Sequence, residues 1–192
     1  KLIDAPKDDL NTLIQAFDQN YRNALNRIIS AKFSVTKAIV DSVESIISAR
    51  YPKDNPYFAN YMKYRFAMLD HIAYHRNRDI IVKEYFTGKD VLYRNPAYCE
   101  LFDEMFPNMF ANFKHHFASH DDKRQAIDDK SYHSLKRSIA AEPKIASSDL
   151  ADYMIIKGMK DAYYTDTIPK EPLIALADSV ASYCPNKDVR AM

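Results

Sequence analysis

The sequence predicts an all-α protein, an irregular and mostly antiparallel bundle of about seven to nine helices with no substantial sheet. Apolar residues recur every three or four positions along most of the chain, which is the spacing of one helix face. Only two of the 192 residues are glycine, whereas hairpin turns depend on glycine for positive φ. Asn-Pro pairs and other proline-marked corners separate the apolar runs, as they do between helices.

The first two helices follow from apolar stripes and their caps. Asp8 and Asp9 can cap a helix whose inner face is Leu10, Leu13, Ile14, Phe17, Tyr21, Leu25 and Ile28. Ser34 can cap a second helix, and its expected inward residues are Ile39, Val43, Ile46 and Ile47. This helix should end before Tyr51-Pro52, because the residue before a proline avoids helical geometry.

The middle of the chain carries two Asn-Pro helix starts. Asn55-Pro56 opens a long helix with the inner stripe Phe58, Tyr61, Arg65, Met68, Leu69 and Ile72. A shorter helix over 79–86 should end at Gly88, which can adopt the left-handed C-cap conformation. Asn95-Pro96 then opens a helix through Phe106.

The C-terminal third is predicted from a looser pattern followed by two clear helices. Residues 111–144 are highly charged and are expected to be mobile or exposed, apart from a short helix around Leu135. Ser147 or Ser148 can cap a central helix whose Gly158 suggests a close crossing by another helix. The last full helix starts at Pro169 and Pro172, with the inner face Leu173, Leu176, Ala177, Val180 and Ala181.

Composition narrows the class of protein and its partners. The chain is 47% hydrophobic and 28% charged, so we expect one globular domain over residues 1–192. With 27 basic and 26 acidic residues, charge gives no argument for a nucleic-acid partner, and no apolar run is long enough for a transmembrane span. The chain starts at Lys1 without Met and ends in DVRAM, the pattern of a first helical turn. We therefore expect it to be excised from a longer polypeptide.

Arg65 is the polar residue of most interest, because it falls inside an apolar stripe. A buried guanidinium needs a carboxylate nearby, and the candidates are Glu84, Glu100 and Asp103. The sequence favours a structural ion pair and leaves a ligand anchor open. Tyrosines around it suit a core and also an interaction surface for a partner domain, foremost Tyr57, Tyr61, Tyr64, Tyr93 and Tyr98.

Metal, cofactor and thiol motifs are weak. His71 and His75, like His116 and His120, have i,i+4 spacing, but each pair needs a third ligand, so we predict no metal and no cofactor. Acidic pairs at 121–122 and 128–129 lack the spacing of a DDxxD motif and are read as a solvated face. Cys99 and Cys184 form no C-x-x-C pair, and whether they form a disulfide in an exported protein stays open.

Three segments carry a family resemblance: PYFANYMKYRFAML at 56–69, KEYFTGKDVLYRNPAYCELFDEMF at 83–106 and IIKGMKDAYYTDTIPKEPLIALADSV at 155–180. They resemble the helical region that precedes the thioredoxin fold in exported thioredoxin-like (TlpA-type) proteins of Gram-negative bacteria. The resemblance covers about a third of the chain and rests on structural aromatic residues. It implies a location in the cell envelope, periplasmic or membrane-anchored, and a thioredoxin-like domain of the same polypeptide as partner. The C-x-x-C pair of that domain is not in this chain, so no catalytic residue is carried over.

Three function classes follow. The first is a non-catalytic helical domain that packs on, or presents clients to, a downstream redox domain. The second is a stand-alone binding module of the cell envelope, and the third is a helical repressor. The repressor is disfavoured because residues 1–50 lack a basic, glycine-containing helix-turn-helix. A stand-alone enzyme is disfavoured too, since no catalytic motif can be argued. Client and oligomeric state stay open.

Overall fold

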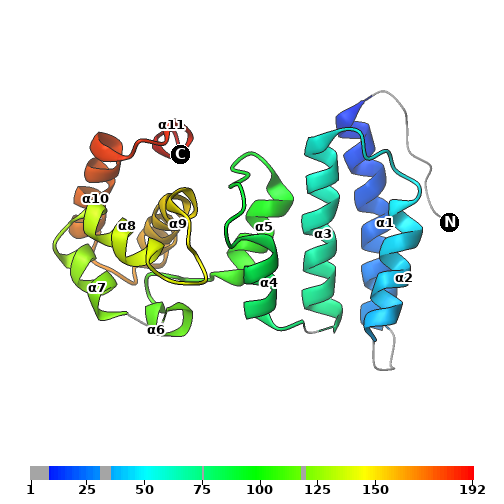
Figure 1. The fold of residues 1–192 in the computed structure, drawn as a ribbon, viewed down its shortest axis with the longest axis horizontal. Coiled ribbons are helices and arrows are strands. Elements are labelled where there is room, and N and C mark those ends of the chain that lie inside the picture. The colour runs from blue at the N-terminus through cyan, green and yellow to red at the C-terminus, as the bar shows by residue number, and fades with distance from the viewer. Residues whose placement is uncertain (1–8, 31–35, 75, 118–119) are drawn as a thin grey trace. The chain divides into compact units, whose positions relative to one another are not determined.

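The computed structural model describes residues 9–30, 36–74, 76–117 and 120–192, and within these ranges the protein is built of helices without strands (Figure 1). The predicted all-α class is confirmed. The described residues form eleven helices rather than the seven to nine expected, because the charged stretch before residue 130 and the last residues also form short helices.

Two compact units divide the chain, and each is described separately. The first unit holds residues 1–81 and 94–101, and the second holds residues 82–93 and 102–192. The boundary falls inside two helices, α4 (Arg78–Tyr85) and α5 (Pro96–Met105). That residues 1–192 form a single domain stays a prediction.

In the first unit, three antiparallel helices lie side by side (Figure 1). They are α1 (Leu10–Ser30), α2 (Lys37–Ser48) and α3 (Pro56–Tyr74). Asp9 caps α1 as predicted, its carboxylate accepting from the Thr12 backbone N–H at 2.9 Å. The other expected caps at this end, Asp8 and Ser34, lie outside the described residues.

An aromatic cluster forms the core of this unit. Phe17 of α1 is fully buried, and its ring contacts five other rings at centroid distances of 5.5–6.1 Å. These rings belong to Tyr21, Tyr51, Phe58, Tyr61 and Phe66. Most of the contacts are edge-on, the geometry that aromatic quadrupoles favour. The apolar stripes of α1 and α3 therefore meet through large rings.

The predicted inner face of α2 is wrong at two positions. Val40 and Ile47 are buried, whereas Ile39 and Ile46 are 47% and 53% exposed. The apolar residues of α2 occupy a broad sector of the helix circumference. The helices α1 and α3 pack against only part of that sector. The hydrophobic periodicity of the sequence identified the apolar side of α2, but it could not show which residues on that side would be buried by other helices.

Both Asn-Pro pairs begin helices, and hydrogen bonds connect the start of α5 to the start of α3. Asn55 caps α3 by accepting from the Phe58 N–H at 3.1 Å. The Asn95 amide, at the start of α5, donates to the Tyr57 carbonyl at 3.3 Å. The Tyr57 hydroxyl donates to the Arg94 carbonyl at 3.1 Å. These bonds hold the beginning of α5 against the first turn of α3.

The second unit contains the C-terminal helices, of which α8, α10 and α11 pack against α9, while α7 packs against α8 and α10 (Figure 1). They are α6 (Phe113–His116), α7 (Asp121–Asp128), α8 (Tyr132–Ala140), α9 (Ser148–Thr165), α10 (Lys170–Tyr183) and α11 (Lys187–Arg190). As predicted, Ser147 caps α9, accepting from the Leu150 N–H at 3.3 Å. Gly88 in this unit has φ of 64°, the left-handed conformation expected of it after α4.

The expectation that residues 111–144 are exposed is wrong for much of this stretch. It contains α6, α7 and α8, and its buried residues include Phe113, Phe117, Lys123, Ile127 and Leu135. On α7, Lys123, Ala126 and Ile127 share one face, and all three are buried. The high charge of the stretch concealed this short buried face.

The inner face of α10 is narrower than predicted. Leu173, Leu176 and Val180 are buried, whereas Ala177 and Ala181 are exposed. With this face α10 is in contact with α7, α8 and α9. Alanine adds so little apolar area that its position on a helix face is weakly determined.

Candidate functional site

The Arg65 cluster in the first unit consists of Asp18, Tyr21, Tyr61, Arg65 and Glu100. Arg65 pairs with Glu100 at 2.6 Å and with Asp18 at 3.4 Å, and its side chain is 16% exposed. Glu100 was among its predicted partners, whereas Asp18 was not. The Tyr61 hydroxyl donates to both oxygens of Asp18 at 2.8 and 2.9 Å. An arginine within an apolar stripe is thus neutralised by two carboxylates.

Two tyrosine rings enclose the guanidinium. Its central carbon lies 4.7 Å from the ring centroid of Tyr21 and 5.8 Å from that of Tyr61, both within cation–π range. Burial opposes the charge of Arg65, but Tyr61, Asp18 and Glu100 outweigh it and raise its pKa. Every group that contacts Arg65 here stabilises its positive charge, so the cluster holds a permanent cation inside the unit.

The five tyrosines proposed for an interaction surface have two kinds of surroundings. Tyr61, Tyr64 and Tyr98 are buried, and the rings of Tyr64 and Tyr98 meet edge-on at 5.0 Å. These three belong to the core of the first unit. Tyr57 and Tyr93 are half-buried, and both use their hydroxyls in hydrogen bonds.

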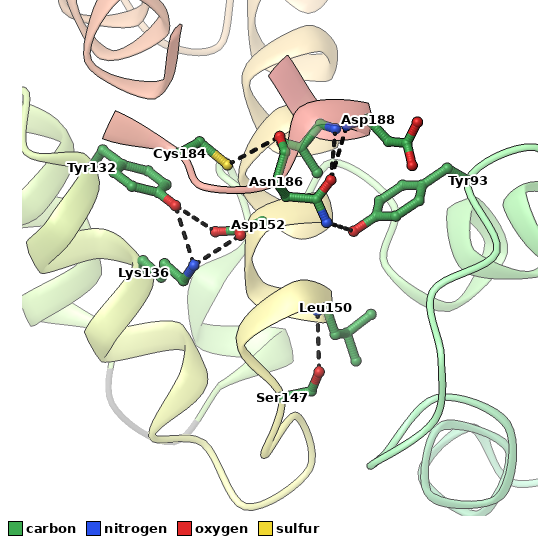
Figure 2. A network of polar contacts seen from close by, with 10 residues as sticks. Tyr93, Tyr132, Lys136, Ser147, Leu150, Asp152, Cys184, Asn186 and Asp188 are labelled. Carbon is green, nitrogen blue, oxygen red and sulfur yellow. Dashed lines mark hydrogen bonds and ion pairs between the residues drawn. The ribbon is translucent and has the colours of Figure 1, made fainter. Parts of the chain in front are cut away.

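A second polar cluster, the Asp152 cluster, lies in the second unit and consists of Tyr132, Lys136, Asp152 and Cys184 (Figure 2). Asp152 is fully buried. Its carboxylate accepts from the Tyr132 hydroxyl and from the Lys136 ammonium, each at 2.8 Å. Burial raises the pKa of Tyr132, and hydrogen bonds to Cys184 and Asp152 raise it further. Sequence reasoning missed this cluster, although an aspartate within the apolar run of α9 is the same signal that identified Arg65.

A third charged pair, Lys123 and Glu142, is also buried in the second unit. The Lys123 ammonium lies 2.6 Å from a Glu142 carboxylate oxygen and 4.9 Å from the ring centroid of Phe117. Sequence reasoning assigned Lys123 to the exposed charged stretch. Its spacing of three and four residues from Ala126 and Ile127 was the available signal.

His116 and His120 do not form the i,i+4 pair that their spacing suggested. His116 ends α6 and is buried, with its Nε2 3.1 Å from the Pro107 carbonyl oxygen, whereas His120 lies half-exposed before α7. The helical spacing assumed for this pair is therefore interrupted, and His75 of the other pair lies outside the described residues. No group of three histidine, cysteine or acidic side chains suited to a metal occurs in the part of the chain that the structure describes. The structure forms no disulfide at either described cysteine, Cys184 being buried and Cys99 half-buried.

Fold and clusters together define an all-α protein with two compact units, with a partly buried ion pair in the first unit and buried ion pairs in the second, each between residues distant in the sequence. Within the described ranges, no helix combines the length and the apolar character needed to cross a membrane. Comparison of the chain with protein-family models, with curated proteins and with solved structures finds no match.

The Tyr21 hydroxyl gives a testable consequence of the Arg65 cluster. It is buried without a hydrogen-bond partner among the described residues, and burial raises the pKa of Tyr21 from 10.0 to about 12. Because the folded state favours the neutral phenol, this stabilisation is complete below pH 10 and is lost as the pH rises toward 12. We expect Tyr21→Phe to change stability little at pH 7 and to remove a loss of about 2 kcal/mol between pH 10 and 12.

Urea unfolding followed by circular dichroism at pH 7, 10 and 12 measures this effect. Tyr61→Phe is the matched control, because it deletes a hydroxyl that donates to Asp18. It should lower stability at pH 7 by about 1.5–3 kcal/mol. An equal loss for both variants at pH 7 would contradict the assignment of Tyr21.

Proposed function

We propose that the chain is a non-catalytic helical domain of an exported thioredoxin-like protein of the cell envelope. In this proposal it packs on, or presents clients to, a redox domain of the same polypeptide. The identity of the partner and the envelope location rest on the resemblance of the three segments at 56–69, 83–106 and 155–180. The structure contributes an observation that supports an interaction role.

The apolar face left open on α2 is that observation. Ile39 and Ile46 lie one heptad apart on the helix, so they share a face, and each is about half exposed. On the adjacent part of the apolar sector, Val40 and Ile47 are buried within the first unit. A helix with a covered and an uncovered apolar strip is typical of an element that packs on its own domain and on a partner. We assign the redox domain as the occupant of this face.

The polar clusters support a structural rather than a catalytic role for the interior. Arg65 is paired with two carboxylates, and Asp152 accepts from both a tyrosine and a lysine. A general base or nucleophile must face a substrate, whereas these groups face one another across helices. Their arrangement suits the task of joining helices.

The mass of the native protein in its source cells tests the proposal. An antibody raised against this 22.2 kDa chain should detect, in the envelope fraction, a band larger by the ~100–150 residues of another domain. Peptide mass spectrometry of that band should find a C-x-x-C pair outside the present sequence. A band at about 22 kDa would overturn the attached redox domain and favour the stand-alone envelope binding module.

The α2 face is tested separately in the native polypeptide. Ile39→Asp with Ile46→Asp should speed limited proteolysis between this domain and the redox domain, because the charges oppose burial of the face. Ile174→Asp is the matched control, since Ile174 is equally exposed but lies in the second unit. Equal proteolysis of both variants would show that the α2 face does not hold the partner.

A further inference from the structure

Residues 184–190, here called the C-terminal strap, follow α10 and include the short helix α11. Within the strap, α11 packs against α9, and the side chains of Cys184 and Val189 are buried. Other residues of the strap are exposed, among them Pro185, Lys187 and Arg190. The strap is therefore attached to the second unit along one side.

Asn186 is the centre of its polar attachment (Figure 2). The side-chain oxygen of Asn186 accepts from the N–H groups of Asp188 and Val189 at 3.0 and 3.2 Å and so caps α11. The side-chain nitrogen donates to the Tyr93 hydroxyl at 2.8 Å. The Tyr93 ring in turn packs edge-on against Tyr153 of α9 at 5.5 Å. The Asn186 side-chain amide thus caps the short helix of the strap and also hydrogen-bonds the strap to Tyr93 in the rest of the unit.

The strap also covers the Asp152 cluster. Cys184 lies beside Tyr132 and Asp152, and its thiol donates to the Asn186 carbonyl at a sulfur–oxygen distance of 3.8 Å (Figure 2). Lifting the strap would therefore expose the thiol and bring water to a buried carboxylate.

The attachment is small compared with the packing of the rest of the unit. A helix of four residues has no stability of its own, so α11 depends on its cap and on Val189. Segments with few buried contacts open at lower free energy than the core to which they are attached. By this criterion the strap should detach while α8, α9 and α10 stay folded.

We propose that residues 184–190 form a strap that opens independently of the rest of the second unit, and that the Cys184 thiol reacts only in the open form. In this proposal the strap is a conformational device that exposes a buried thiol. The inference does not rest on the proposed function, because it concerns only contacts within the second unit.

Thiol labelling of the full 192-residue chain in a Cys99→Ser background tests the strap. In the reaction with DTNB, the Cys184 thiolate attacks the reagent disulfide, forms a mixed disulfide and releases one coloured thiolate, while the thiol proton goes to solvent. We expect Cys184 to react far more slowly than a short peptide thiol. Asn186→Ala should speed the reaction about tenfold, because it removes the cap and the Tyr93 bond together. Tyr93→Phe, which removes only the latter, should give a smaller increase.

Asn77→Ala is the matched control. Asn77 accepts from the Asp79 N–H at 2.8 Å at the start of α4, in the first unit, so its loss removes a similar cap far along the chain from Cys184. It should leave the labelling rate unchanged. Labelling should also rise less steeply with urea than global unfolding does, because a small segment exposes little surface.

Three results would overturn the strap. Cys184 could react in the parent at the rate of a peptide thiol, which would mean that the strap is not closed. Asn186→Ala could label at the parent rate, which would mean that Asn186 does not hold it. The urea dependence could equal that of global unfolding, which would mean that the strap opens only when the whole chain unfolds.

Discussion

Replacing Lys123 with methionine is expected to lower the free energy of unfolding by about 3–5 kcal/mol. The Lys123 side chain is fully buried and its ammonium lies 2.6 Å from Glu142, which is itself buried. The substitution removes the cation and leaves the carboxylate in a low-dielectric interior without this partner. It also removes the contact of the ammonium with the face of the Phe117 ring. Urea unfolding followed by circular dichroism measures the loss.

Two further variants separate the buried charge from ordinary packing. Lys123→Met combined with Glu142→Leu removes both charges and should recover most of the loss. Lys130→Met breaks an ion pair of 3.2 Å with Glu171, but both of those side chains are exposed, so it should lower stability by less than about 1 kcal/mol. If Lys123→Met lowers stability no more than Lys130→Met, the buried pair is not the source of the effect.

Gly158→Ala is expected to destabilise the protein by about 1–3 kcal/mol, although alanine favours a helix interior over glycine by about 1 kcal/mol. A Cβ at this position of α9 would lie 2.4 Å from two ring carbons of Phe110 and 2.9 Å from the terminal carbon of Met109. Real Cβ atoms do not approach other atoms this closely, so the ring must move within a packed core. Thermal and urea unfolding of the single variant measure the loss.

A compensating substitution identifies the cause. Phe110→Leu shortens the side chain that meets the new methyl group, so in the Gly158→Ala background it should recover part of the loss. Gly88→Ala is the contrasting control, because Gly88 has φ of 64° with no atom within 4 Å of the added Cβ. Its loss of about 1–2 kcal/mol comes from backbone strain and should not respond to Phe110→Leu. A neutral or stabilising Gly158→Ala would mean that the contact with Phe110 is not maintained.

Helix starts were well predicted because their signals are local. Asn55 and Ser147 cap their helices with side chains that reach only three residues ahead. The left-handed conformation of Gly88 is likewise a property of one residue. The close approach at Gly158 was also expected, but its partner is the Phe110 ring in the turn after α5 rather than a crossing helix. The neighbour was unpredictable because it lies almost fifty residues away in the chain.

The burial and ion pairing of a charged side chain could be predicted only where the residue interrupts an apolar stripe. Arg65 stood inside such a stripe, so its need for a carboxylate could be stated, and Glu100 meets it. Lys123 stood among other charges, and its spacing from Ala126 and Ile127 was the only local signal that it would be buried. Whether a lysine is solvated or paired in a core depends on the surface that other helices place around it, as α7 shows.

The sequence by itself determined the helical class, most helix boundaries and the broad apolar sector of α2, because backbone geometry and hydrophobic spacing act over a few residues. Only the tertiary structure decided that Val40 and Ile47 are covered while Ile39 and Ile46 are open, and that Asp18 and Asp152 complete polar clusters between helices. Burial and ion pairing depend on residues far apart in the chain. Their positions are set by the packing of whole helices, which no local pattern encodes.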